Sequence, residues 1–163
     1  MSIATLKALV TLAEPVESIT TMEAASESRW LDAVAIAVER PNDALGCAYL
    51  LGYVVECRLK AALGRVNNVL PPADLYAAVV HPLAVQDRHN VEALLRECLA
   101  RRTPRLPPLS LVRESAWHFH VAAIAGAHAV GYRYKSYAVA VPALNGLYSS
   151  VEWIVDNIAE LWN

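Results

Sequence analysis

The segment from Ala44 to Gly64 constrains the fold more than any other part of the chain, and its sequence is ALGCAYLLGYVVECRLKAALG. Its residues are almost all apolar, with Glu56, Arg58 and Lys60 as the charged exceptions. A helix of this length spans about 30 Å at about 1.5 Å per residue. Because apolar residues surround it on most faces, we expect it to be the central helix of a bundle or to pack against a partner subunit. Glu56 and Lys60 stand four residues apart, so they can pair on one face.

Signals at both ends of this segment predict where the helix begins and ends. Asn42 or Asp43 can accept hydrogen bonds from the exposed amides of the first turn. Gly64 is expected to end the helix in a left-handed conformation, which glycine adopts at little steric cost.

Other segments also carry helical spacings of apolar residues. In residues 26–39 one stripe holds Trp30, Leu31, Val34 and Val38, and the pattern stops before Pro41. Further helical segments are expected at residues 3–13, 74–80 (about one turn), 91–99 after a cap at Asn90, and about 109–129, with a loop or helix break at 131–141.

The last helix has the clearest pattern in the sequence. It begins near Pro142, and its apolar stripe consists of Leu144, Leu147, Tyr148, Val151, Ile154, Val155, Ile158, Leu161 and Trp162. No segment sustains the period-two alternation of a half-buried strand. The sequence therefore predicts an all-α fold: an antiparallel bundle of about five helices in a single domain, 1–163, with residues 1–25 as an N-terminal helical extension.

Composition narrows the class of protein. With 163 residues and 56% hydrophobic content, the chain can bury one substantial core. A formal net charge of −2 argues against a protein that coats nucleic acid by net charge, so an anionic ligand must meet a local patch of positive charge.

The odd number of cysteines (Cys47, Cys57 and Cys98), without CxxC spacing, predicts buried reduced thiols. The N-terminus lacks a signal-peptide pattern and no stretch suits a membrane span, so we predict a cytoplasmic protein.

The sequence predicts no metal and no cofactor. His81, His89 and His128 are scattered, and no set of His and Cys residues has the spacing of a four-ligand zinc site. The GxGxxG and P-loop patterns of nucleotide cofactors are absent.

Three separated segments together resemble a known superfamily. They are AYLLGYVVECRLKAAL from Ala48, HNVEALL from His89 and GYRYKSY from Gly131. The first is similar to a family helix with an internal Glu and a Lys four residues later, the second to a helix start, and the third to an Arg-Tyr element before the final helix. In their order and spacing they resemble the HEPN superfamily, small helical domains of prokaryotic toxins, defence systems and nucleotide-related proteins.

The resemblance implies a four- or five-helix bundle and usually a homodimer whose shared cleft holds the functional groups. It also implies a bacterial defence or toxin-antitoxin context. The expected partners are therefore a second copy, RNA or a nucleotide, and a cognate antitoxin or defence-system protein.

Active members of this superfamily carry Arg followed, after four to six residues, by His, and two copies cut RNA without a metal. Arg113 meets this spacing with His118 after four residues and with His120 after six. A guanidinium can hold a phosphate through two hydrogen bonds, and an imidazole can move the 2′-hydroxyl proton. These three residues are the candidate catalytic residues, although about one such pair is expected by chance in a chain of this composition.

The Arg-Tyr element favours a different interpretation. In the branch that carries it, Arg133 stands nearest the motif arginine, but Ala138, Val139 and Ala140 occupy the positions where histidine is required. This departure favours a non-cleaving module. For Arg113 the alternative is then a solvated or salt-bridged side chain, and for His118 and His120 it is two polar residues on opposite sides of a helix.

Two groups of residues are candidates for binding RNA or another anion. Arg101, Arg102 and Arg105 lie in and beside the proline-broken segment RRTPRLPP, and a solvated loop is the alternative reading. A second group combines positive charge with aromatic faces, as sites for stacking bases do, and the alternative is a lid on the core. Its members are Arg133, Tyr134 and Lys135.

The sequence thus favours a HEPN-like dimeric module that binds RNA, a nucleotide or a partner protein. Two alternatives remain open. One is a metal-independent endoribonuclease in which Arg113 holds the phosphate and His118 handles protons, and the other is a structural subunit of a larger assembly.

Overall fold

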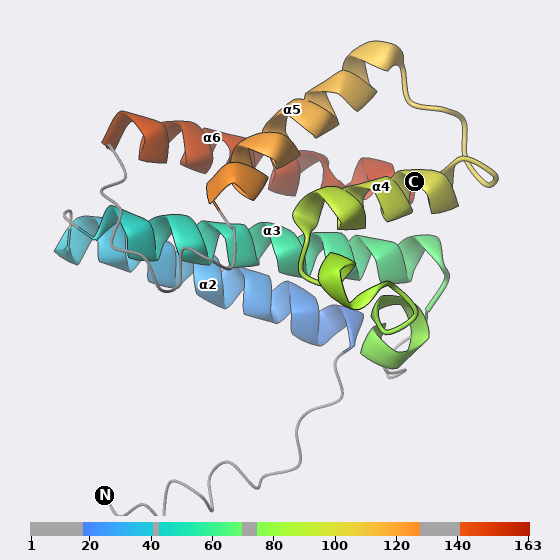
Figure 1. Ribbon diagram of the computed structural model, residues 1–163, viewed down its shortest axis with the longest axis horizontal. Helices are drawn as coiled ribbons and strands as arrows, with labels where there is room; N and C mark the ends of the chain where they lie inside the picture. The colour runs from blue at the N-terminus through green and yellow to red at the C-terminus, as the bar shows by residue number, and fades with distance from the viewer. Residues whose placement is uncertain (1–17, 41–42, 70–74, 128–140) are drawn as a thin grey trace, which may run out of the picture.

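All regular secondary structure in the described part of the chain is helical (Figure 1). The computed structural model describes residues 18–40, 43–69, 75–127 and 141–163. The long helices are α2 (Ile19–Glu39), α3 (Ala44–Val66), α4 (Val91–Arg102), α5 (Leu111–Ala127) and α6 (Val141–Asn157), joined by the short elements η1 (Tyr76–Val80), η2 (Val85–Asp87) and η4 (Ile158–Leu161). The predicted all-α bundle is confirmed at this level, with no strand among these residues.

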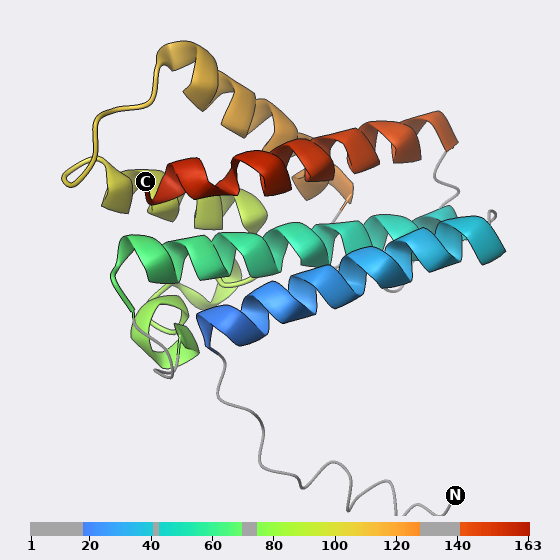
Figure 2. The same cartoon turned by 180° about the vertical axis from the view of Figure 1, so that it is seen from behind.

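The apolar helix α3 lies at the centre of the bundle, as its composition predicts. It contacts α2, α4, α5, α6, η1 and η4. Figures 1 and 2 show α4 and α5 covering one side of α3, while α2 and α6 flank it on the other. Most of its residues are buried, including Leu51, Val55 and Leu59 at 0% exposure. Since one chain supplies all of these neighbours, the apolar character of α3 does not by itself require a partner subunit.

The directions of the helices differ in part from a simple antiparallel bundle. α2 and α3 form an antiparallel hairpin, and α5 runs against α6 (Figure 1). α4 and α6, however, run in the same general direction as α3. The chain between α3 and α4 returns to the middle of α3, where His89 contacts Glu56, so α4 can run in the same direction as α3.

The two ends of α3 give one confirmation and one correction. Asp43 is the N-cap, because its carboxylate accepts a hydrogen bond from the Gly46 amide at 3.0 Å. The expectation that Gly64 ends the helix in a left-handed conformation is wrong. α3 continues past a buried Gly64, and the left-handed residue is Asn68, with φ 56°.

Gly64 has a packing role instead. A Cβ atom at this position would lie 2.4 Å from Leu75 Cδ1 and 3.0 Å from Ile19 Cγ1. Both neighbours are buried, so the missing side chain lets the start of α2 and residue 75 approach α3 closely.

Helix α2 begins earlier than the pattern at 26–39 indicates. Ser18 starts it with a capping box in which its hydroxyl accepts from the Thr21 amide and the Thr21 hydroxyl accepts from the Ser18 amide. α2 therefore runs without a break across residue 25, where the sequence placed the end of the extension. The predicted helix at 3–13 lies outside the described residues.

The apolar stripe of α2 is not its buried face. Ser26 and Ala33 are buried against α3, whereas Leu31 is 66% exposed and Val38 is 76% exposed. Small residues on the inner face let α2 and α3 pack closely, and the larger aliphatic side chains then remain on the outside of the hairpin.

The remaining helices follow their sequence patterns. Asn90 caps α4 by accepting from the amides of Glu92 and Ala93. The stripe of the last helix packs into the core, with Val151, Ile154 and Leu161 at 0% exposure. The predicted break at 131–141 lies outside the described residues except for residue 141, where α6 begins.

The three cysteines are buried and free, as predicted. The Cys98 thiol donates to the Leu59 carbonyl at 3.5 Å, and burial raises the pKa of this thiol. Among the described helices, none combines the length and the apolar character that a membrane crossing requires.

Replacing Gly64 with Ala should destabilise the protein. The added methyl group overpacks the contact with Leu75 and Ile19, which costs about 1–3 kcal/mol, and the better helix propensity of Ala offsets up to about 1 kcal/mol of this. Urea denaturation of Gly64→Ala should therefore give a lower free energy of unfolding. Gly146→Ala is the matched control, because a Cβ there meets no atom within 4 Å. A Gly64→Ala protein as stable as Gly146→Ala would contradict this packing role.

Candidate functional site

Arg113, the candidate phosphate-binding arginine, is engaged within the protein. Its Nε donates to Glu160 Oε2 at 3.2 Å, and its Nη2 donates to Glu160 Oε1 and, at 2.5 Å, to Asn157 Oδ1. The guanidinium also lies 5.0 Å from the centre of the Trp153 ring. Trp117 donates its indole N–H to the same carboxylate at 3.3 Å. These contacts connect the start of α5 with the end of α6 and with η4.

The two candidate histidines lie on different sides of α5. His118 is exposed, and it stands five residues after Arg113, which corresponds to a rotation of about 140° around a straight helix. His120 stands seven residues after Arg113 and returns to nearly the same side. The fold therefore places Arg113 and His120 on the same side of α5, where both contact Trp153, and it places His118 on another side.

His120 packs against α6. Its ring stacks on Trp153 with centroids 4.3 Å apart, and its Nδ1 lies 3.2 Å from the Ser150 hydroxyl. Burial lowers the pKa of His120, so the neutral imidazole is favoured. Arg113 and His120 thus both pack against the Trp153 ring. The Trp117 ring contacts Trp153 edge-on, with the two ring centroids 5.1 Å apart.

An open groove of about 620 Å³ lies beside His120 between α5 and the first half of α6. Its lining is mostly apolar and includes Phe119, Ala123, Gly126 and Leu147. Phe119 lies at the edge of the groove and is 69% exposed. Among the described residues that line this groove none is an acidic, Lys or Arg side chain, and their apolar surface suits an apolar occupant.

The basic residues at the end of α4 do not form one free patch. Arg102 is buried and donates to the backbone carbonyls of Glu160, at 2.8 Å, and Pro107. Arg105 donates to the Val66 carbonyl, and Arg101 lies 3.7 Å from the Glu97 carboxylate. Arg133, Tyr134 and Lys135, the other predicted anion-binding residues, lie outside the described residues.

A buried ionic cluster sits in the middle of α3. Glu56 is 2% exposed and Lys60 is 4% exposed, and they pair at 2.8 Å. His89, at the start of α4 and half-exposed, approaches Glu56 Oε1 with its Nδ1 at 2.9 Å. The Tyr76 ring lies 5.8 Å from the Lys60 ammonium. The four-residue spacing predicted the pairing of Glu56 with Lys60, but it did not predict that the pair is buried. It also did not predict His89 as a third partner. The sequence signal for His89 was the His-Asn start of the next helix.

In the described ranges, no three His, Cys, Asp or Glu side chains lie close enough together to hold a metal ion. Comparisons with protein-family models, curated proteins and solved structures find no match to this chain. A functional argument therefore depends on the chain's own residues.

Removing one partner of the buried pair should be costly, and removing both should not. Lys60→Met leaves the Glu56 carboxylate buried without the ammonium, which should lower the free energy of unfolding by about 3–5 kcal/mol. The double variant Glu56→Leu, Lys60→Met should recover most of this loss, because no buried charge remains. Urea denaturation measures both.

The exposed pair of Glu97 and Arg101 provides the control for this experiment. Arg101→Met should cost less than about 1 kcal/mol, because solvent screens that ion pair. A loss of similar size for Lys60→Met would show that the Glu56 pair is not held in a low-dielectric interior.

Proposed function

We propose that this chain is a HEPN-like dimeric module that binds a partner protein and does not cleave RNA through Arg113 and His118. The bacterial defence or toxin-antitoxin context is part of the proposal and rests on the sequence resemblance. The single observation that carries the non-cleaving assignment is the engagement of Arg113 by Glu160, Asn157 and Trp153. A guanidinium that is already neutralised and hydrogen-bonded gains little from a phosphate.

Dimerisation is supported by the outer face of α5. Large apolar side chains are exposed in its first half, with Leu111 at 83%, Val112 at 79% and Phe119 at 69%. The exposed residues of its second half on the same face are small, namely Ala122, Ala123 and Gly126. Exposed apolar side chains gathered on one face are typical of a surface that contacts another protein.

This face is complementary to itself. A two-fold axis at Phe119 would set α5 of one copy antiparallel to α5 of the other. Val112 of each copy would then meet Gly126 of its partner, and Ser115 would meet Ala123. The two Phe119 rings would meet at the axis, Val112 would face the small Gly126, and the groove beside Gly126 would be filled. We therefore assign the second copy to this face.

A charge in the centre of this face should separate the two copies. Phe119→Glu should convert a dimer to a monomer, because the two-fold axis would bring two carboxylates together in an apolar contact. Light scattering during gel filtration, over a range of protein concentrations, measures the molar mass of the protein and so distinguishes dimer from monomer. Val38→Glu is the control, since Val38 is equally exposed but lies on α2. A wild-type monomer at high concentration, or a dimer broken only by Val38→Glu, would exclude the α5 interface.

A ribonuclease assay tests the competing enzymatic function. The protein is incubated with RNA in EDTA, and we expect no fragments ending in cyclic phosphate. His118→Ala is the informative variant, because His118 is exposed and its loss should leave the fold intact. Cleavage by the parent protein that disappears in His118→Ala would replace the binding module with a metal-independent endoribonuclease.

A further inference from the structure

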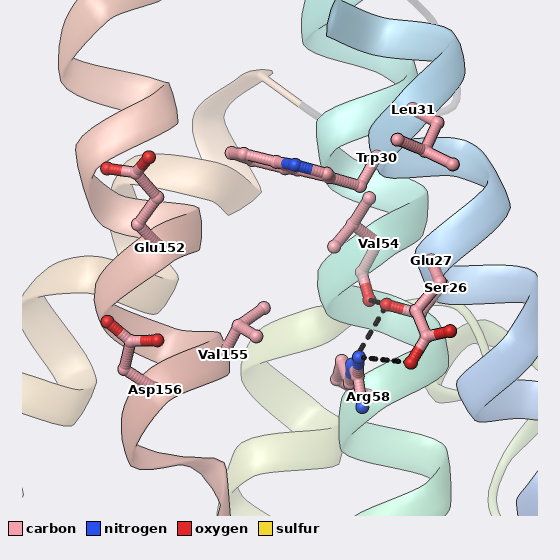
Figure 3. A pocket seen from close by; sticks show the side chains of 9 residues that line it. All are labelled: Ser26, Glu27, Trp30, Leu31, Val54, Arg58, Glu152, Val155 and Asp156. Atoms are coloured by element: carbon pink, nitrogen blue, oxygen red, sulfur yellow. Dashed lines mark hydrogen bonds and ion pairs between the residues drawn. The ribbon is translucent and has the colours of Figure 1, made fainter.

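A second groove lies on the other side of the molecule, between α2 and α6. Its volume is about 450 Å³, and α3 forms its floor through Val54 and Arg58. Figure 3 shows Trp30 reaching from α2 across the groove toward α6, with Glu152 and Asp156 on the opposite wall. This groove is separate from the α5 face and shares none of the residues considered there.

The charges of this groove are separated. Arg58 points toward α2, where its Nε donates to the Ser26 hydroxyl at 3.1 Å and its Nη2 lies 3.5 Å from Glu27. Glu152 and Asp156, one turn apart on α6, are exposed, and their carboxylates form no hydrogen bond or ion pair with another residue in the described ranges. The α6 wall therefore presents two negative charges that Arg58, the one cation among the described residues lining the groove, does not neutralise.

An aromatic face and aliphatic side chains complete the groove. The Trp30 ring is fixed by an edge-on contact with Tyr148, with centroids 5.5 Å apart. Val54 and Val155 lie between Trp30 and Arg58 in Figure 3. A cation held by carboxylates beside an indole face gains from both, and the methylene groups of Lys or Arg can pack on the valines.

The apolar surface continues from the groove along α2. Leu31 lines the groove and is 66% exposed, and Val34 and Val38 follow it at helical spacing with 38% and 76% exposure. An occupant that is longer than one side chain would therefore rest on aliphatic residues spaced over two turns. A helix with apolar residues at the same spacing matches this surface.

We propose that the groove between α2 and α6 binds a basic amphipathic helix of a partner protein, with one Lys or Arg side chain inserted between Trp30 and the carboxylates of Glu152 and Asp156. The two carboxylates would repel a nucleic acid, which makes a protein the matching class of partner. The proposal rests on this groove alone and does not depend on dimerisation through α5.

The test uses the full chain and a synthetic 14-residue helix of Leu and Lys with its leucines on one face. Isothermal titration calorimetry at physiological salt measures the dissociation constant. Glu152→Gln combined with Asp156→Asn should weaken binding about ten-fold, because two exposed ion pairs are lost. Glu92→Gln combined with Glu114→Gln removes the same charge from exposed sites on α4 and α5, and it should leave the dissociation constant within about two-fold.

A photo-crosslinking form of the same peptide locates the bound helix. Mass spectrometry should find crosslinks on α2 and α6 around Trp30 and Leu31. Equal weakening by both pairs of substitutions would overturn the proposal in favour of attraction by net charge, and crosslinks confined to α5 would also overturn it. If the Glu152 and Asp156 substitutions separate the protein's own dimer, the groove belongs to a second copy and not to a basic partner.

Discussion

The burial of α3 is the constraint on which the rest of the structure depends. A long helix with apolar residues on most of its faces must be covered on most of its faces, and α2, α4, α5 and α6 all pack against it. Small residues on both sides of the contact allow this close packing. α2 presents Ser26 and Ala33 to α3, and Gly64 of α3 leaves room for Ile19 and Leu75.

The buried pair of Glu56 and Lys60 is an exception within this apolar helix. Two charges in the interior lose their hydration, and their mutual attraction offsets that loss only when the geometry is good. Their distance of 2.8 Å, with His89 next to the same carboxylate, meets that condition. Such a pair adds little net stability. Because both charges lie on α3, the contact that joins this helix to the start of α4 is the one between His89 and Glu56.

The contacts of α5 explain why its polar and aromatic side chains lie on one side of the helix and its exposed apolar side chains on the other. Arg113, Trp117 and His120 face α6 and η4, where they contact Trp153 on α6 and Glu160 on η4. The side that packs inward is therefore rich in polar and aromatic groups, and the outward side keeps Phe119 and the small residues. On the opposite side of α3, the groove between α2 and α6 combines an aromatic ring with unneutralised carboxylates. In the proposed function, the outer face of α5 and the groove between α2 and α6 are two distinct contact surfaces.

The sequence by itself determined that α3, α4, α5 and α6 are helices and that Asn90 caps α4, and it offered Asp43 as one of two candidate caps of α3, because helical periodicity and capping are local properties. It also determined the pairing of Glu56 with Lys60, which a four-residue spacing on one helix makes possible. Only the tertiary structure decided that Gly64 is a contact point, that Leu31 faces outward, and that Arg113 is neutralised by Glu160 from the far end of the chain. Each of these depends on which surfaces of distant segments meet. The spacing of residues along one helix fixes their relative directions but does not contain that information.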